Sequence, residues 1–196
     1  MKPWLSMAVA GVTLATASPS SSRVVDYNLD KAAIESAAQD QGIQGPFSDL
    51  PDAAAYPFTL ENAAAADHMV KIVSIYCQAY KMDNPISALM QHLLPSTPAG
   101  VSGPALRVTK GSTLLRCLGS GEFKNICKNE VKLSAELRFQ LADGTPVTRP
   151  ISVNVEREGR VGGFCGNMAR YTAIVSREAG IELLNKASAA YREAHE

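Results

Sequence analysis

The clearest pattern in the sequence is a strict alternation of apolar and polar residues between positions 131 and 141. A period of two is typical of a β-strand that buries one face and leaves the other in water. Asp143-Gly144 follows as a turn signal, and apolar residues then alternate back from Val147 to Val155. The chain therefore predicts a long amphipathic hairpin, and Pro150 places its return strand at a sheet edge or at a bulge. The apolar positions of the first strand are Val131, Leu133, Ala135, Leu137, Phe139 and Leu141.

Apolar residues recur at helical spacing on both sides of this hairpin. A helix is predicted from Thr59, a good N-cap, to about Met82, and a second from Pro85 to Leu94. A C-terminal helix is expected from Asn167 to about Glu193. Two short strands are predicted at 106–109 and 113–117. The apolar face of the first helix would be formed by Met69, Ile72, Val73, Tyr76, Cys77 and Tyr80.

This order of elements predicts an α+β fold. We expect two N-terminal helices, a three- to four-stranded antiparallel sheet with the long hairpin, and a C-terminal helix packed on one face. Residues 57–196 would form the single domain. Residues 18–56, broken by Gly42, Gly45-Pro46 and Pro51, predict a linker or loosely docked arm with a possible short helix at 30–39.

The first 17 residues have the three parts of an export signal: Lys2, an apolar run from Leu5, and the small-residue exit Ala15-Thr16-Ala17. We predict cleavage after Ala17 and a periplasmic or secreted product. No cysteine lies near the cut, which argues against a lipid anchor. No later segment approaches the ~20 apolar residues of a membrane-spanning helix, so no transmembrane anchor is expected.

The four cysteines, Cys77, Cys117, Cys127 and Cys165, all follow the predicted cut. An even number in an oxidising compartment predicts disulfides, but four cysteines allow three pairings. We favour Cys117–Cys127, which closes a short loop, together with Cys77–Cys165. Zinc binding and thiol chemistry are the competing interpretations. Zinc sites use closely spaced pairs such as Cys-x2-Cys, which this chain lacks.

A glycine-rich stretch at 159–166 precedes the C-terminal helix and predicts a loop. Glycines before a helix can cradle an anion, but the further residues of a phosphate-binding motif are missing. The simpler interpretation is that they let the chain turn around Cys165. An exposed aromatic in such a loop would serve contact, so the stretch is a possible contact loop. Its residues are Gly162, Gly163, Phe164 and Gly166.

Only a few titratable residues are candidates for catalysis or metal binding. His68 and His92 fall outside the apolar rows of the two predicted helices, which favours solvated histidines. Glu178 and Glu182 stand one helical turn apart and could be paired acids. The commoner interpretation is a solvated face that also holds Arg177 and Lys186. We therefore name no catalytic residue, no metal ligand and no cofactor.

The balance of charge limits the partners, because 19 Lys+Arg stand against 19 Asp+Glu. A nucleic-acid binder would normally show a basic excess, so we do not expect nucleic acid as the main partner. The hairpin and terminal helix over about 130–192 resemble small bacterial envelope-assembly proteins in outline. We expect a non-enzymatic binding or envelope-assembly accessory protein, with a protein or envelope component as partner. The alternatives are an exported hydrolase using carboxylates and a disulfide-stapled inhibitor of an extracellular enzyme.

Overall fold

The computed structural model describes most of the chain after residue 22. The expected signal peptide, 1–17, lies outside the described residues, as do Gly163, Phe164 and Gly166 of the expected contact loop. The described residues are 23–27, 31–40, 42–43, 49, 52–75, 77, 79–96, 103–119, 124–162, 165 and 167–196.

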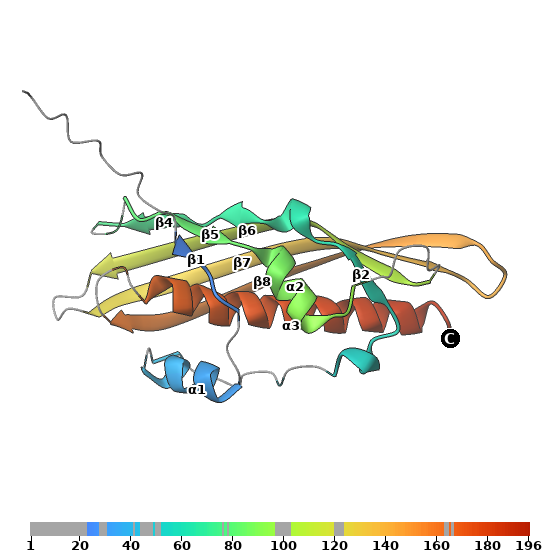
Figure 1. The fold of residues 1–196 in the computed structure, drawn as a ribbon, viewed down its shortest axis with the longest axis horizontal. Helices are drawn as coiled ribbons and strands as arrows, with labels where there is room; N and C mark the ends of the chain where they lie inside the picture. The colour runs from blue at the N-terminus through green and yellow to red at the C-terminus, as the bar shows by residue number, and fades with distance from the viewer. Residues whose placement is uncertain are drawn as a thin grey trace, which may run out of the picture.

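The fold is α+β, with three α-helices and two sheets among the described residues. Figure 1 shows an elongated molecule in which the long strands of the larger sheet and the C-terminal helix run side by side. Two short 3₁₀ turns, η1 and η2, precede and follow β2 in the sequence. The elements in chain order are β1 (Arg23–Val24), α1 (Lys31–Asp40), η1 (Ala53–Ala55), β2 (Thr59–Asn62), η2 (Ala64–Ala66), β3 (His68–Met69), β4 (Lys71–Ser74), β5 (Met82–Asn84), α2 (Ile86–Leu93), β6 (Ala105–Gly119), β7 (Lys124–Gln140), β8 (Pro146–Gly162) and α3 (Met168–Glu193).

The larger sheet is built on the antiparallel strands β6, β7 and β8, and β2 and β4 each pair with β6 in parallel. The hairpin predicted from the alternation is β7–β8. Pro150 lies opposite Glu136 in β8, which is an edge strand, so the missing backbone donor is tolerated. The two short strands expected at 106–117 are one continuous strand, β6.

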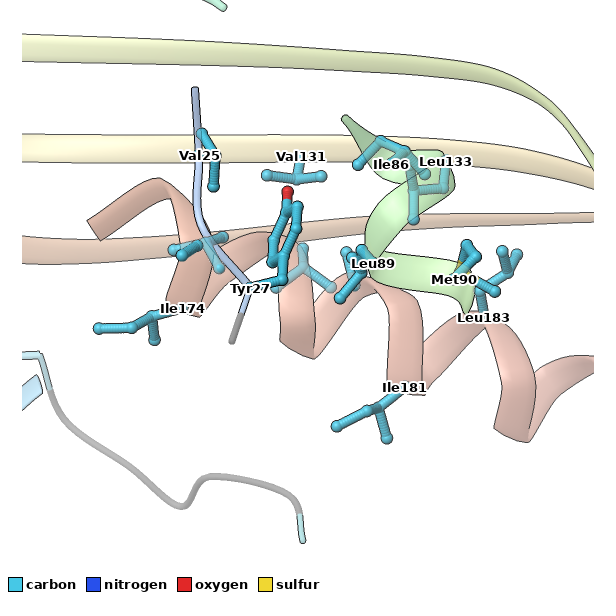
Figure 2. Packing of buried hydrophobic residues seen from close by; sticks show 14 of the residues in the cluster. Val25, Tyr27, Ile86, Leu89, Met90, Val131, Leu133, Ile174, Ile181 and Leu183 are labelled. Atoms are coloured by element: carbon cyan, nitrogen blue, oxygen red, sulfur yellow. The ribbon is translucent and has the colours of Figure 1, made fainter. Parts of the chain in front are cut away.

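The core lies between this sheet and α3, which packs on β7 and β8. Helix α2 packs against α3, and Figure 2 shows Leu89 and Met90 of α2 close to that helix. Gly180 of α3 makes this approach possible, because a β-carbon there would lie 2.8 Å from Leu93 Cδ1. The glycine that weakens the helix by propensity therefore leaves room for the Leu93 side chain, which would have to shift if a β-carbon were present.

The prediction of an α-helix from Thr59 to Met82 is wrong. These residues form β2, η2, β3, β4 and the start of β5 instead, so the architecture has one helix fewer before the sheet than expected and more strands. Val70 and Val73 stand three residues apart, so a helix would place both on one face. Instead, the side chain of Val70 is buried and that of Val73 is exposed. Pairing of β4 with β6 outweighs local spacing here, because strand propensity depends strongly on the partner strand.

The segment expected to be a linker or loosely docked arm contributes side chains to the core. Val25, Ile34 and Ile43 are each less than 5% exposed. Helix α1 lies where the possible short helix was expected, and it packs against α3. This docking removes part of the α3 surface from water.

No helix within the described ranges is both long and apolar enough to cross a bilayer.

Candidate binding groove

The outer face of the sheet carries the even-numbered side chains of β7 and β8 and is mostly polar. A hydrogen bond from the Lys132 ammonium holds the pKa of Glu130 below its ordinary value. Ion pairs on this face include Lys128 with Glu156 at 2.8 Å, Lys132 with Glu130 at 2.7 Å, and Arg138 with Glu136 at 2.9 Å.

One end of the same face is apolar. Val73, Ile75, Leu118 and Ile126 are 49%, 70%, 73% and 40% exposed, and they are four of the six exposed large apolar side chains among the described residues. They line an open groove of about 510 Å³. Single exposed apolar residues need no explanation, but a contiguous group marks a candidate contact surface. We call this feature the sheet-end groove; its lining residues are Ile72, Val73, Ser74, Ile75, Arg116, Cys117, Leu118, Ile126, Lys128 and Glu158.

Strand register explains how the groove forms. Val73 of β4 pairs with Arg116 of β6, Arg116 with Lys128 of β7, and Lys128 with Glu158 of β8. These four residues form a row across the sheet that is charged at three positions. Side chains two residues further along a strand lie on the same face. The next row therefore carries Leu118, beyond Arg116, opposite its register partner Ile126.

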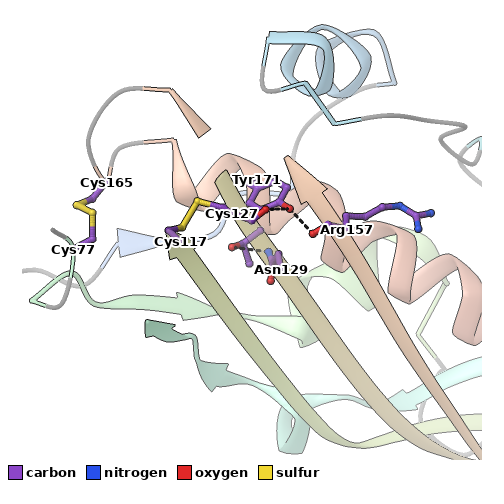
Figure 3. The surroundings of a disulfide bond; sticks show 8 residues. Cys77, Cys117, Cys127, Asn129, Arg157, Cys165 and Tyr171 are labelled. Carbon is purple, nitrogen blue, oxygen red and sulfur yellow. Dashed lines mark hydrogen bonds between the residues drawn. A yellow bond between two sulfur atoms is a disulfide. The ribbon is translucent and has the colours of Figure 1, made fainter. Parts of the chain in front are cut away.

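The structure contains two disulfides, Cys117–Cys127 and Cys77–Cys165, which are the two pairs favoured from the sequence. Figure 3 shows Cys117–Cys127 joining β6 directly to β7. Its two residues are buried, so their neighbours Leu118 and Ile126 point to the opposite, exposed face. The cross-strand disulfide therefore holds together the two strands that present the centre of the groove.

The second disulfide and Tyr171 anchor the same end of the molecule. Cys77–Cys165 ties the segment after β4 to the segment before α3. The Tyr171 hydroxyl of α3 donates to the carbonyl oxygens of Arg157, at 2.6 Å, and Cys127, at 3.0 Å (Figure 3). These contacts fix α3 behind the sheet, so the groove lies on a supported surface.

His68 lies in a buried polar network, not on a solvated helix as expected. Its Nδ1 donates to the Ala66 carbonyl oxygen at 2.7 Å, and Nε2 accepts from Thr113 Oγ1 at 2.8 Å. Asn84 Nδ2 donates to Thr113 Oγ1 and to Ser176 Oγ, each at 3.0 Å, and Tyr27 donates to Asn84 Oδ1. The network joins the segment after β1, strands β3, β5 and β6, and helix α3.

The Thr113–His68 contact has the order of a nucleophile and its base. Thr113 is only 3% exposed and Asn84 is fully buried, so a substrate has no approach to the hydroxyl. Each member of the network is satisfied by another member. We therefore assign it a structural role in linking the strands to α3.

Glu178 and Glu182 do not converge on one site, and only part of the expected solvated face exists. Arg177 and Glu178 are buried, with side chains 4% and 6% exposed, and form an ion pair of 2.9 Å. Glu182 is exposed and pairs with Lys186 at 3.1 Å. The two carboxylates therefore have different environments and different partners.

The other predicted site residues have simple positions. Gly159 and Gly162 belong to β8, so the expected loop starts after them. His92 is exposed in the last turn of α2, as expected. Within the described residues, no group of three or more His, Cys, Asp or Glu side chains could hold a metal ion.

The groove was not predicted from the sequence. A signal was present for Leu118 and Ile126, because residues that flank a cross-strand cystine on the two strands share the face opposite to it. No such signal existed for Val73 and Ile75, which were assigned to a helix. The sequence matches no protein-family model, and no curated protein shows significant similarity to it.

Proposed function

We propose that this chain is an exported, non-enzymatic binding protein that holds a short apolar segment of another exported or envelope protein in the sheet-end groove. The observation that carries the proposal is the contrast along one sheet face. Polar residues, several of them in ion pairs, make up most of that face, whereas four large apolar side chains are exposed together at one end. Exposure of such a group has a cost in solubility, which a binding role explains.

The size of the groove favours a short segment over a folded subunit. A standard protein–protein interface involves about 20–30 residues on each side. The groove is lined by ten described residues, of which four are the exposed apolar ones. Its open shape also argues against a small molecule, because small-molecule pockets bury most of their ligand.

Export is supported by the cysteine usage together with the N-terminal sequence. All four cysteines are paired, and structural disulfides persist in oxidising compartments. The signal-like sequence of residues 1–17 leads to the same compartment. A binding partner would then be another protein of the envelope or the exterior.

Site-specific photo-crosslinking in the native envelope tests the proposal. A photoreactive residue replaces Leu118 in one variant and Ser152, an exposed residue of β8 on the same face, in the control. We expect a crosslink from position 118 to an apolar segment, and competition by that segment as a free peptide. Equal crosslinking from both positions, or no competition by the peptide, would contradict the proposal.

A further inference from the structure

We propose that the occupant of the sheet-end groove binds as an extended strand alongside β4, with a carboxylate directed to Lys71 and Arg116. This inference rests on the proposed function and adds the conformation and charge of the partner segment. It predicts a pattern in the partner sequence: an acidic residue, then an apolar residue two positions away, and a second apolar residue two positions further.

The position of β4 at a sheet edge favours an added strand. Among the described residues, β6 is the one strand that pairs with β4, so β4 is an edge strand of the larger sheet. Four consecutive residues, from Ile72 to Ile75, line the groove. The β4 backbone therefore runs along the groove, where an incoming strand can add main-chain hydrogen bonds.

The exposed side chains of β4 define the residues that such a strand would meet. Val73 and Ile75 are exposed and stand two residues apart, which is the spacing of one face of a strand. Lys71, two residues before Val73, is also exposed. A strand added to this edge would meet a basic residue and then two apolar residues at intervals of two, and the pattern proposed for the partner is complementary to this order.

The charges beside the groove favour an acidic partner segment. Lys71 and Arg116 form no ion pair within the described part of the chain. Lys128, in the same row as Arg116, already pairs with Glu156 at 2.8 Å. Glu130, which Arg116 also attracts, already pairs with Lys132, and Glu158 is the one carboxylate among the groove-lining residues. Lys71 and Arg116 together outweigh Glu158, so the remaining local charge is positive, which favours an acidic partner and disfavours a second copy that would bring the same positive charge.

Selection from a random peptide library displayed on phage tests the proposed pattern. The oxidised full chain is the target, and a variant carrying Leu118→Ser and Ile126→Ser serves for counter-selection, because both side chains are exposed. We expect enriched peptides with the acidic and apolar spacing given above. Apolar residues spaced three and four apart, which indicate a helix, or no enrichment at all would overturn the inference.

N-methylation of the best synthetic peptide tests strand addition itself. A strand at an edge uses the N–H groups of alternate residues, so methylating one alternate set should weaken binding by more than about tenfold and the other set should have little effect. Lys71→Glu and Arg116→Glu should each weaken binding by about fivefold, whereas Lys132→Glu, outside the groove, should not. Equal affinity of both methylated peptides overturns strand addition.

The two proposals can fail separately. A crosslink from position 118 to an apolar segment that lacks the acidic residue supports the proposed function and overturns this inference. A dimer in solution that dissociates in the Leu118→Ser/Ile126→Ser variant identifies a second copy as the occupant and overturns it too.

Discussion

Gly111 of β6 and Ala66 of η2 are packed so closely that a β-carbon on Gly111 would lie 2.3 Å from the Ala66 carbonyl oxygen. It would also lie 2.7 Å from His68 Nδ1, the atom that donates to that same carbonyl. A contact with backbone cannot be relieved by rotating a side chain. The glycine therefore allows η2 and β3 to lie against the long strand that supports β4.

Gly111→Ala should lower the free energy of unfolding by about 3 kcal/mol, the upper range for inserting a methyl group into a packed site. Urea unfolding followed by circular dichroism measures the change. Gly103→Ala is the control, because nothing lies within 4 Å of a β-carbon there, and its effect should stay within about 1 kcal/mol. Equal effects of the two substitutions would contradict the described packing.

The two glutamates of α3 should differ in their effect on stability. Glu178→Gln removes a charged group that the buried Arg177 guanidinium contacts at 2.9 Å, which should cost about 3 kcal/mol. Glu182→Gln removes only an exposed pair with Lys186 and should change stability by less than about 0.5 kcal/mol. Chemical denaturation of both variants at neutral pH makes the comparison, and a larger loss for Glu182→Gln would contradict the burial of Glu178.

The sequence predicted the elements that have a long, uninterrupted pattern. The alternation from Val131 to Leu141 lies in β7 apart from its last residue, and the C-terminal helix begins and ends within one residue of expectation. Both elements are long enough for periodicity to dominate over local accidents. The coarse α+β class follows from them.

The short strands between β2 and β5 could not be predicted in this way. A strand of two to four residues, such as β3 or β4, has no room for a period. Its pairing depends on residues elsewhere in the chain: β3 pairs with β5, and β4 pairs with β6 through Lys71 and Leu114. Apolar residues at helical spacing therefore suggested a helix between Thr59 and Met82. The groove was missed for the same reason, because half of its exposed apolar side chains belong to this stretch.

The two disulfides should differ in their contribution to stability. Loop entropy predicts about 2.7 kcal/mol for Cys117–Cys127, which closes a short loop, and about 4.6 kcal/mol for Cys77–Cys165, which closes a long one. Paired replacements by Ala, one disulfide at a time, test this order by urea unfolding.

Because Leu118 and Ile126 adjoin the first disulfide, its loss should also reduce peptide binding in the groove. A variant without this disulfide that binds the peptide fully would contradict that support role.

Alkaline pH should destabilise the protein through two buried tyrosines, Tyr27 and Tyr171. Burial raises the pKa of both phenols above the ordinary value of about 10. In the unfolded chain they ionise near pH 10, whereas in the folded protein they stay neutral to a higher pH. The stability that they contribute is therefore present below about pH 10 and is lost as the pH rises above it.

Each phenol should contribute up to about 1.4 kcal/mol of lost stability per pH unit in this range. The urea midpoint of the wild-type protein should fall steeply above about pH 10, and tyrosinate absorbance should show a late fraction that appears only on unfolding. In a Tyr27→Phe/Tyr171→Phe variant, the starting stability is lower because the hydrogen bonds to Asn84, Arg157 and Cys127 are lost. Its decline with pH should nevertheless be shallower. A decline as steep as that of the wild type would mean that groups other than these two phenols control alkaline unfolding.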